Sequence, residues 1–363
     1  MRILISGYYG FDNVGDEALL AVMVARMRER LPRADIEVLS ARPDATRYAL
    51  QVDATPRADL PSVRRAIERS SVVVSGGGGL LQNATSTRSL LYYAGVIRAA
   101  IRARKPTMIF AQSIGPLDLI GRSIVRECCR GLAAATVRDE RSRALLGQLV
   151  PSIEVRRGAD PVFLIEEPEP SGDDLALQGL GAQSDPLVVV SVRPSARFAE
   201  GAERIAEAVD RLAFEHGARV GFVPFGGAAD AEASTVVMRK CRSNPTLLPV
   251  DDIGAAARIF ARARLVIGMR LHAVILAIRL GVPFLAIPYD PKVSALCDDI
   301  AYPLAPLWTP HGRSAAAPAV AELADEAWCR RDELAAALRA DAERMRSLAL
   351  ENFTVLERIA AAA

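Results

Sequence analysis

The chain has 363 residues, of which 51% are hydrophobic and 5% aromatic, and its net charge at pH 7 is +2. This length is sufficient for two domains, each with its own core, and the composition is that of a folded α/β protein, not of a disordered or disulfide-stapled chain. The balanced charge argues against a nucleic-acid partner. The five cysteines are odd in number and form no CxxC pair, which indicates a cytoplasmic protein without a disulfide framework or a zinc site.

Strands and helices alternate along the first half of the chain. Apolar runs predict strands near residues 2–6, 36–39, 72–75, 107–112, 135–137 and 154–155, and helical spacing predicts helices near 16–31, 88–104 and 119–131. An acidic, proline-rich stretch near 166–174 predicts an exposed linker. The same alternation restarts at residue 187 and continues to about residue 287.

This repeated alternation predicts two Rossmann-like, doubly wound α/β domains, residues 1–170 and 171–363. We expect them to face each other across a ligand-binding cleft. The helical segment near 318–361 is expected to cross back onto the first domain. The longest apolar region, near 265–288, is interrupted by Arg270, His272 and Arg279, so it predicts strand, helix and strand, not a membrane span.

The loop after the first predicted strand is rich in glycine and holds Tyr8 and Asn13, and Asp16 opens the helix that follows. Its spacing matches neither a dinucleotide motif nor a P-loop. Two interpretations remain open: a shaped turn with a capped helix start, and a sugar pocket lined by these side chains. Asp16 and Glu17 would themselves occupy the positive end of the helix.

Two further loops could contact a ligand. The run 76–79, with Gly77 and Gly78, allows the backbone to approach a ligand closely, although a plain glycine turn is the alternative. Ser113, after the fifth predicted strand, could supply a polar contact or belong to a simple turn.

Cationic side chains follow four separate predicted strands: Arg138, Arg193, Arg270 and Lys292. A guanidinium group can hold a phosphate or carboxylate through two parallel hydrogen bonds. The alternatives are surface pairing of Arg138 with Asp139 or Glu140, a similar pairing of Arg193, a domain-interface ion pair for Arg270 and a solvated Lys292. Together the four cations predict an anionic substrate.

His272 stands two residues after Arg270, in Gly268-Met269-Arg270-Leu271-His272-Ala273, where a predicted strand turns into a helix. In extended geometry the two side chains would share one face. Imidazole exchanges protons near neutral pH, so His272 is a candidate acid/base, and a satisfied core histidine is the alternative. His216 and His311 are interpreted as bystanders, and no cluster has the spacing of a metal site.

Short motifs along residues 1 to about 300 together resemble the polysaccharide pyruvyl transferase family, in particular the CsaB branch that acts on secondary cell-wall polymers. The motifs, in chain order, are Ser6-Gly7-Tyr8-Tyr9-Gly10-Phe11 with Asn13 and Gly15-Asp16-Glu17, Ser75 with residues 76–79, Gln112-Ser113-Ile114-Gly115-Pro116, Arg138-Asp139, Gly158-Ala159-Asp160-Pro161, Ser191-Val192-Arg193-Pro194, Gly268 to Ala273, and Pro288-Tyr289-Asp290-Pro291-Lys292-Val293.

The resemblance implies a GT-B-like pair of domains and a donor, phosphoenolpyruvate, whose pyruvyl group is moved onto a sugar diol as a cyclic ketal with release of phosphate. In the CsaB branch the acceptor is N-acetylmannosamine on a lipid-linked precursor, which implies a cytoplasmic enzyme at the inner face of the plasma membrane. The catalytic arginine, histidine and lysine of the family fall on Arg138, His272 and Lys292.

This chemistry suits the residues. Phosphoenolpyruvate carries a phosphate and a carboxylate, which cations would hold, and His272 would transfer protons. The expected substrate-binding residues are Arg270, Arg193, Tyr8, Asn13, Asp16, Gly77, Gly78 and Ser113, with no metal and no resident cofactor. Two alternatives are a GT-B glycosyltransferase that uses a nucleotide-sugar and a non-catalytic protein that binds sugar phosphates.

Overall fold

The computed structural model describes residues 1–168, 185–195, 198–288, 291–300, 302–304 and 320–363, without the side chains of residues 199, 200 and 291. The chain divides into two compact units, Met1–Ile165 with Met345–Ala363, and Glu166–Arg344. The predicted boundary between residues 170 and 171 lies outside the described residues. Each unit has the predicted Rossmann-like α/β fold.

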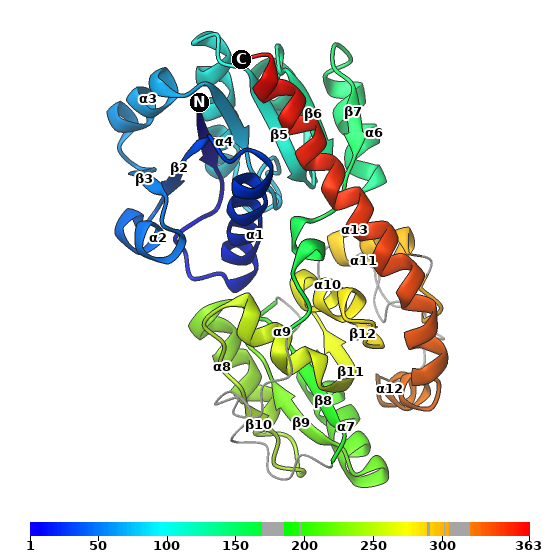
Figure 1. Cartoon of the computed structure of the whole chain (residues 1–363). Coiled ribbons are helices and arrows are strands. Elements are labelled where there is room, and N and C mark those ends of the chain that lie inside the picture. Colours follow the sequence, from blue (N-terminus) through cyan, green and yellow to red (C-terminus); the bar gives the residue numbers. More distant parts are fainter. Residues whose placement is uncertain (169–184, 196–197, 289–290, 301, 305–319) are drawn as a thin grey trace. The chain divides into compact units, whose positions relative to one another are not determined.

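The first unit contains a parallel seven-stranded sheet in the order β3-β2-β1-β4-β5-β6-β7 (Figure 1). Helices cover both faces of the sheet, and β4 is therefore fully buried at Val72, Val73 and Val74. Burial on both faces explains why the strands are apolar runs in the sequence. The strands are β1 (Arg2–Ser6), β2 (Asp35–Ser40), β3 (Asp53–Pro56), β4 (Val72–Ser75), β5 (Thr107–Gln112), β6 (Ala134–Val137) and β7 (Val155–Arg157).

One face of this sheet packs against four helices, α3 (Leu60–Arg69), α4 (Thr87–Arg102), α5 (Leu119–Cys128) and α6 (Glu140–Leu149). Ile109 of β5 belongs to the core cluster on this side. The next residue, Phe110, therefore points to the opposite face, which α1 (Val14–Arg30), the short helix η1 (Pro161–Leu164) and the end of α13 (Arg331–Ala361) cover. Helix α2 (Pro43–Leu50) connects β2 to β3.

The second unit has a parallel five-stranded sheet in the order β10-β9-β8-β11-β12. Helices α7 and α12 pack together on β8 and β11 through a cluster that includes Val190, Ile267, Val209 and Trp328. The elements are β8 (Leu187–Ser191), α7 (Phe198–His216), β9 (Arg219–Phe222), α8 (Gly227–Met238), β10 (Thr246–Leu247), α9 (Ile253–Ala261), β11 (Ala263–Gly268), α10 (Leu271–Arg279), β12 (Phe284–Ala286), α11 (Pro291–Asp299) and α12 (Val320–Cys329).

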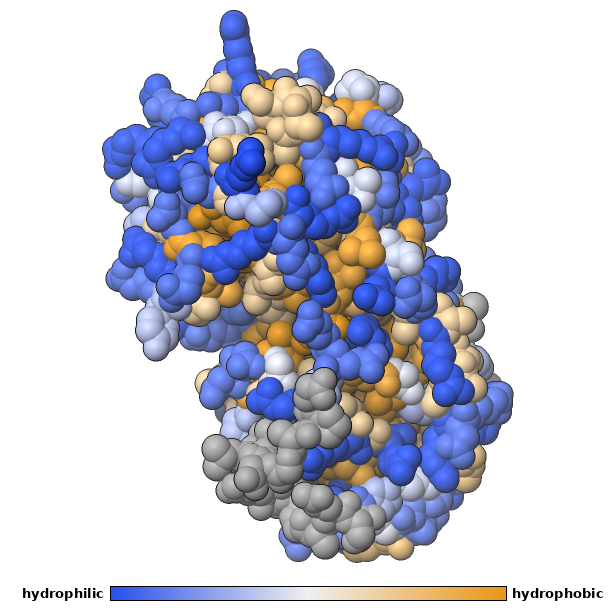
Figure 2. Space-filling view, viewed as in Figure 1, coloured by the Kyte–Doolittle hydropathy of each residue, from blue (hydrophilic) through white to orange (hydrophobic). Residues whose placement is uncertain are grey.

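On the face drawn in Figure 2, hydrophilic side chains cover most of the surface, with hydrophobic ones between them. Within the described ranges, no helix combines the length and the apolar character that crossing a bilayer requires.

Helix α13 begins in the second unit and ends in the first (Figure 1). Asn352, which is fully buried, donates its side-chain amide to the carbonyl oxygen of Ala159 at 2.8 Å. The ring of Phe353 meets Phe110 edge-on, with centroids 5.0 Å apart. The last part of the chain is thus a structural element of the first unit.

We expect Asn352→Ala to lower the free energy of unfolding of the first unit by about 1–3 kcal/mol, because a buried carbonyl loses its donor. The measurement is urea denaturation followed by circular dichroism. Arg339→Ala, at an exposed position of the same helix, is the control and should change the free energy by less than about 0.5 kcal/mol. Equal effects of the two substitutions would contradict this role for Asn352.

Candidate active site

The predicted residues of the first unit gather at one edge of its sheet. In a parallel sheet the carboxyl ends of all strands lie at the same edge, and ligands bind where the strand order reverses. The reversal here lies between β1 and β4. The predicted residues follow the four adjacent strands β1, β4, β5 and β6: Tyr8, Asn13 and Asp16, then Gly77 and Gly78, then Ser113, then Arg138.

The loop after β1 is fastened to the start of α1. Asn13 is the N-cap residue, and its Oδ1 accepts a hydrogen bond from the backbone N–H of Gly15 at 3.1 Å. The Glu17 carboxylate accepts the N–H groups of Gly10 and Phe11, at 2.7 and 3.2 Å. With Asp16 also in the first turn, acidic groups of the chain occupy the positive end of this helix, as the sequence predicts.

Two glycines of this edge make room for Tyr9. A Cβ atom on Gly7 would lie 2.2 Å from the Tyr9 ring, and one on Gly76 would lie 2.3 Å from its hydroxyl oxygen. Burial raises the pKa of the Tyr9 phenol well above its usual value, and the nearby Asp16 charge adds to the rise. Tyr9 is therefore a neutral part of the core beneath the edge.

Gly77 and Gly78 differ in their surroundings. A Cβ atom on Gly77 would lie 2.6 Å from Leu19, so this glycine is required by packing. Gly78 has a φ of +91°, which favours glycine, and its Cβ would lie 3.2 Å from Oδ1 of Asp16. The groups that approach the backbone of the two glycines are thus side chains of this unit. A ligand role for these glycines stays a prediction.

Arg138 is buried in a network of hydrogen bonds. Its Nη1 lies 2.5 Å from Oδ2 of Asp160, and its Nε donates to Oγ of Ser113 at 2.7 Å. The Ser113 hydroxyl in turn donates to Asp139 at 2.8 Å. The ion-pair partner of Arg138 is thus Asp160, which follows the neighbouring strand β7. The alternative expectation, a surface pair with Asp139 or Glu140, is wrong.

A cation–aromatic group at the same edge contains Arg57, which the sequence did not indicate as a site residue. Tyr8 and Phe11 stack with centroids 4.2 Å apart, and each side chain remains about 40% exposed. The Arg57 guanidinium, after β3, lies 5.0 Å from the centroid of Phe11 and 4.3 Å from that of Tyr92 in α4. No local pattern marks Arg57, because the rings that hold it are distant in sequence.

The predicted residues of the second unit follow three adjacent strands, β8, β11 and β12. These carry Arg193, then Arg270 and His272, then Lys292. The strand order reverses between β8 and β11, which places Arg193 and His272 on either side of the switch point. The side chains of Arg193, His272 and Lys292 are half-buried.

Arg270 is held by a carboxylate that the sequence analysis did not single out. Its Nε donates to Oδ2 of Asp230 at 2.7 Å, and its Nη2 bonds Oδ1 of the same, fully buried side chain. Asp230 also accepts the N–H of Gly226 at 2.7 Å. A Cβ atom on Gly226 would lie 2.1 Å from Nη2 of Arg270, so a larger residue at this position would displace the Arg270 guanidinium from Asp230.

The extended geometry expected for Arg270 and His272 applies only to the first. Arg270 has extended backbone angles at the N-cap position, whereas His272 is the second residue of α10. An arginine side chain cannot accept the hydrogen bonds of the first turn, and that turn contains no acidic residue. The positive end of α10 is thus suited to an anion, unlike that of α1.

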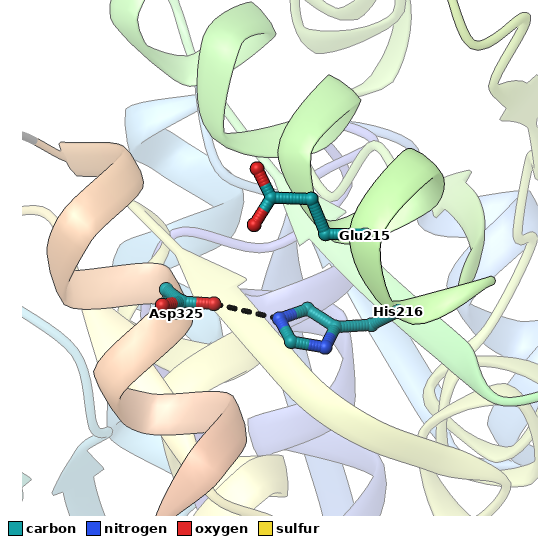
Figure 3. Close-up of side chains that lie close together, drawn as sticks. All are labelled: Glu215, His216 and Asp325. Atoms are coloured by element: carbon teal, nitrogen blue, oxygen red, sulfur yellow. Dashed lines mark hydrogen bonds and ion pairs between the residues drawn. The ribbon is translucent and has the colours of Figure 1, made fainter.

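Among the described residues, Glu215, His216 and Asp325 place potential metal ligands within 4.8 Å of one another (Figure 3). His216 bonds Asp325 through Nε2 at 2.6 Å, and Arg211 lies 3.2 Å from Glu215 and 3.6 Å from Asp325. The arginine offsets the charge that would attract a cation. We interpret the group as a polar link between α7 and α12, which is compatible with His216 as a bystander.

The comparisons with known proteins identify a family. The model of the polysaccharide pyruvyl transferase family matches residues 13–291, which is more than half of the chain. A comparison with curated proteins gave no significant match.

Solved structures with a similar fold include proteins in complex with UDP or a UDP-sugar. Anabaena Alr3699/HepE, in complex with UDP and glucose, is 14% identical, with 99% of this chain and 100% of that chain covered and a TM-score of 0.66. The UDP-GlcNAc 2-epimerase from Neisseria meningitidis is 12% identical, with the same coverage and TM-score. A glycosyltransferase from Rickettsia africae is 8% identical, with 99% and 98% covered and a TM-score of 0.62. These similarities support the two-domain, GT-B-like fold class.

We expect Asp160→Asn to destabilise the first unit by about 3–5 kcal/mol, because it leaves the buried Arg138 guanidinium without its counter-charge. Chemical denaturation measures the loss. The matched control is Glu140→Gln, which breaks the exposed ion pair with Arg143 and should leave the unfolding midpoint nearly unchanged. Similar midpoints for both variants would show that the Arg138 network does not stabilise the fold.

Proposed function

Because the chain belongs to the polysaccharide pyruvyl transferase family, we propose that it transfers the pyruvyl group of phosphoenolpyruvate to a sugar diol, forms a cyclic ketal and releases phosphate. The observation that carries this proposal lies in the second unit. His272 stands at the β8/β11 switch point, between the cations that follow β8 and β12. An anionic donor that must also gain a proton needs this combination.

The proposed reaction balances as follows. The methylene carbon of the donor gains a proton and becomes a methyl group, while the adjacent carbon forms bonds to both sugar oxygens. The bond from that carbon to the phosphate oxygen breaks, and the electron pair leaves with phosphate. The two sugar hydroxyls lose two protons in the reaction. One of them balances the proton that the new methyl group gains, and the other balances the proton on the departing phosphate. No metal or resident cofactor takes part in this scheme.

The residues of the second unit suit the donor. We assign the phosphate to Lys292 and the N-terminus of α10, and the donor carboxylate to Arg193. His272 is assigned as the acid that protonates the methylene carbon and the base that accepts a hydroxyl proton. We also assign Arg270 to substrate binding. The ion pair with Asp230 keeps its guanidinium in a fixed position.

The residues of the first unit have separate assignments. Arg138, with Nε and Nη1 already held by Ser113 and Asp160, offers a fixed positive charge to the reaction. We assign the acceptor sugar to the exposed pair of Tyr8 and Phe11, since aromatic walls with a few polar groups are typical of small-molecule sites. The remaining binding assignments are Asn13, Asp16, Gly77, Gly78 and Ser113.

For the acceptor we propose N-acetylmannosamine on a lipid-linked cell-wall precursor, as the motifs of the CsaB branch imply. A second candidate function is glycosyl transfer from a nucleotide-sugar, because similar structures contain UDP or UDP-sugars. One assay separates the two. Phosphate release from phosphoenolpyruvate in the presence of a lipid-linked or aryl-linked disaccharide supports the first, and turnover that requires a UDP-sugar supports the second.

We expect His272→Gln to lower kcat for phosphate release by about 10²–10⁴-fold, which is the usual contribution of general acid–base catalysis. Lys292→Met should lower kcat/KM for phosphoenolpyruvate. Steady-state kinetics measures both, and circular dichroism checks that each variant is folded.

His216→Gln serves as the matched control, because it removes an imidazole that pairs with Asp325 on α12. It should keep nearly the parental turnover. Parental turnover by His272→Gln, or an equal loss in His216→Gln, would refute the acid/base assignment.

A further inference from the structure

The segment 60–130 of the first unit concentrates positive charge. It contains eleven Lys and Arg residues and three Asp and Glu residues, a net charge of +8, whereas the whole chain carries +2. The remaining residues are therefore net acidic. Helices α3, α4 and α5 lie in this segment and pack side by side on one face of the sheet. We call these three helices the basic layer.

The acidic groups of this segment already have partners. Glu68 pairs with Arg64 at 2.8 Å, Glu127 pairs with Arg98 at 3.1 Å, and Asp118 caps α5 by accepting the N–H of Gly121. Where the structure describes the chain, four arginines of α4 and α5 form no ion pair and are exposed: Arg88, Arg102, Arg122 and Arg126. Their charge is available to an anionic surface.

Exposed apolar side chains mark one end of the same layer. Leu60 is 67% exposed, Leu91 53%, Leu119 83% and Ile120 65%. Each lies in the first or second turn of its helix, and a helix that connects two parallel strands starts at the carboxyl edge of the sheet. The apolar side chains therefore stand along the edge that holds the candidate site residues of this unit, and most of the arginines lie behind them along the helices.

From this pattern we propose that the basic layer docks on a lipid bilayer with anionic headgroups. Leu60, Leu91, Leu119 and Ile120 enter the interface between headgroups and acyl chains, and the arginines bind the headgroups. Apolar insertion combined with basic side chains is the usual composition of interfacial membrane binding. This inference does not depend on the proposed reaction, although it would bring the edge of the sheet close to a lipid-linked acceptor.

The test is sedimentation of the full chain with phosphatidylcholine vesicles, with and without phosphatidylglycerol. We expect binding only to the anionic vesicles, and a loss of binding when NaCl is raised from about 0.1 to about 1 M, which shortens the screening length from ~10 to ~3 Å. Arg122→Gln with Arg126→Gln should weaken partitioning by roughly 30-fold, since each basic residue near such a surface contributes about 1 kcal/mol. Leu119→Ser with Ile120→Ser should weaken it by at least about tenfold.

The control variants change an exposed aromatic side chain and two exposed arginines away from the basic layer. Tyr48→Ser alters a side chain on α2 that is 85% exposed, and Arg33→Gln with Arg339→Gln removes two exposed arginines. These variants should bind like the parent. Phosphate release with a water-soluble acceptor should be unchanged in every variant, so failure of docking and failure of the proposed reaction are distinguishable.

Three results would overturn the proposal. They are equal binding to neutral and anionic vesicles, equal loss of binding in the layer and control variants, and no vesicle binding by the parent chain. A solution dimer that Leu119→Ser with Ile120→Ser dissociates would instead assign this surface to a second copy of the chain.

Discussion

The candidate site depends on one constraint of parallel sheets: each strand must end at the same edge as its neighbours. Both units obey it, and in both the strand order reverses once, between β1 and β4 and between β8 and β11. At the reversal, the loops that follow the two neighbouring strands run in opposite directions. A ligand can therefore reach the backbone and side chains between these loops. Residues as distant in sequence as Arg193 and Lys292 thereby come to one edge of one sheet.

Both units also fix an arginine at this edge with a buried aspartate. Asp160 holds Arg138 from 22 residues away, and Asp230 holds Arg270 from 40 residues away. Replacing such pairs by apolar residues is often neutral for stability, so the two pairs fit a need for a fixed cation better than a need for stability. The side chains that orient the guanidinium groups are thus as much a part of the candidate site as the arginines themselves.

The sequence predicted the fold class and the strands that Arg138, Arg193, His272 and Lys292 follow, because buried parallel strands appear in a sequence as apolar runs. It did not predict that His272 and Lys292 are the second residues of α10 and α11. It did not predict β3, where polar residues and Pro56 occupy a strand at the edge of the sheet. Nor did it predict Asp160, Asp230 or Arg57 as partners, because pairing through space leaves no local pattern. The glycine run left open a ligand contact or a plain turn. Packing against Tyr9 and Leu19, which accounts for Gly76 and Gly77, could not be predicted from the local sequence.

The first turns of α1 and α10 differ in charge. Acidic residues fill the positive end of α1, whereas α10 has Arg270 at its N-cap and His272 as its second residue. The most direct test of a proton-transferring, phosphate-releasing site is the reaction in D₂O with phosphoenolpyruvate and the disaccharide acceptor, followed by mass spectrometry. We expect a product that lacks the donor phosphate and carries one solvent deuterium in its ketal methyl group. A product that keeps the donor phosphate, or a ketal methyl group without deuterium, would contradict the proposed reaction.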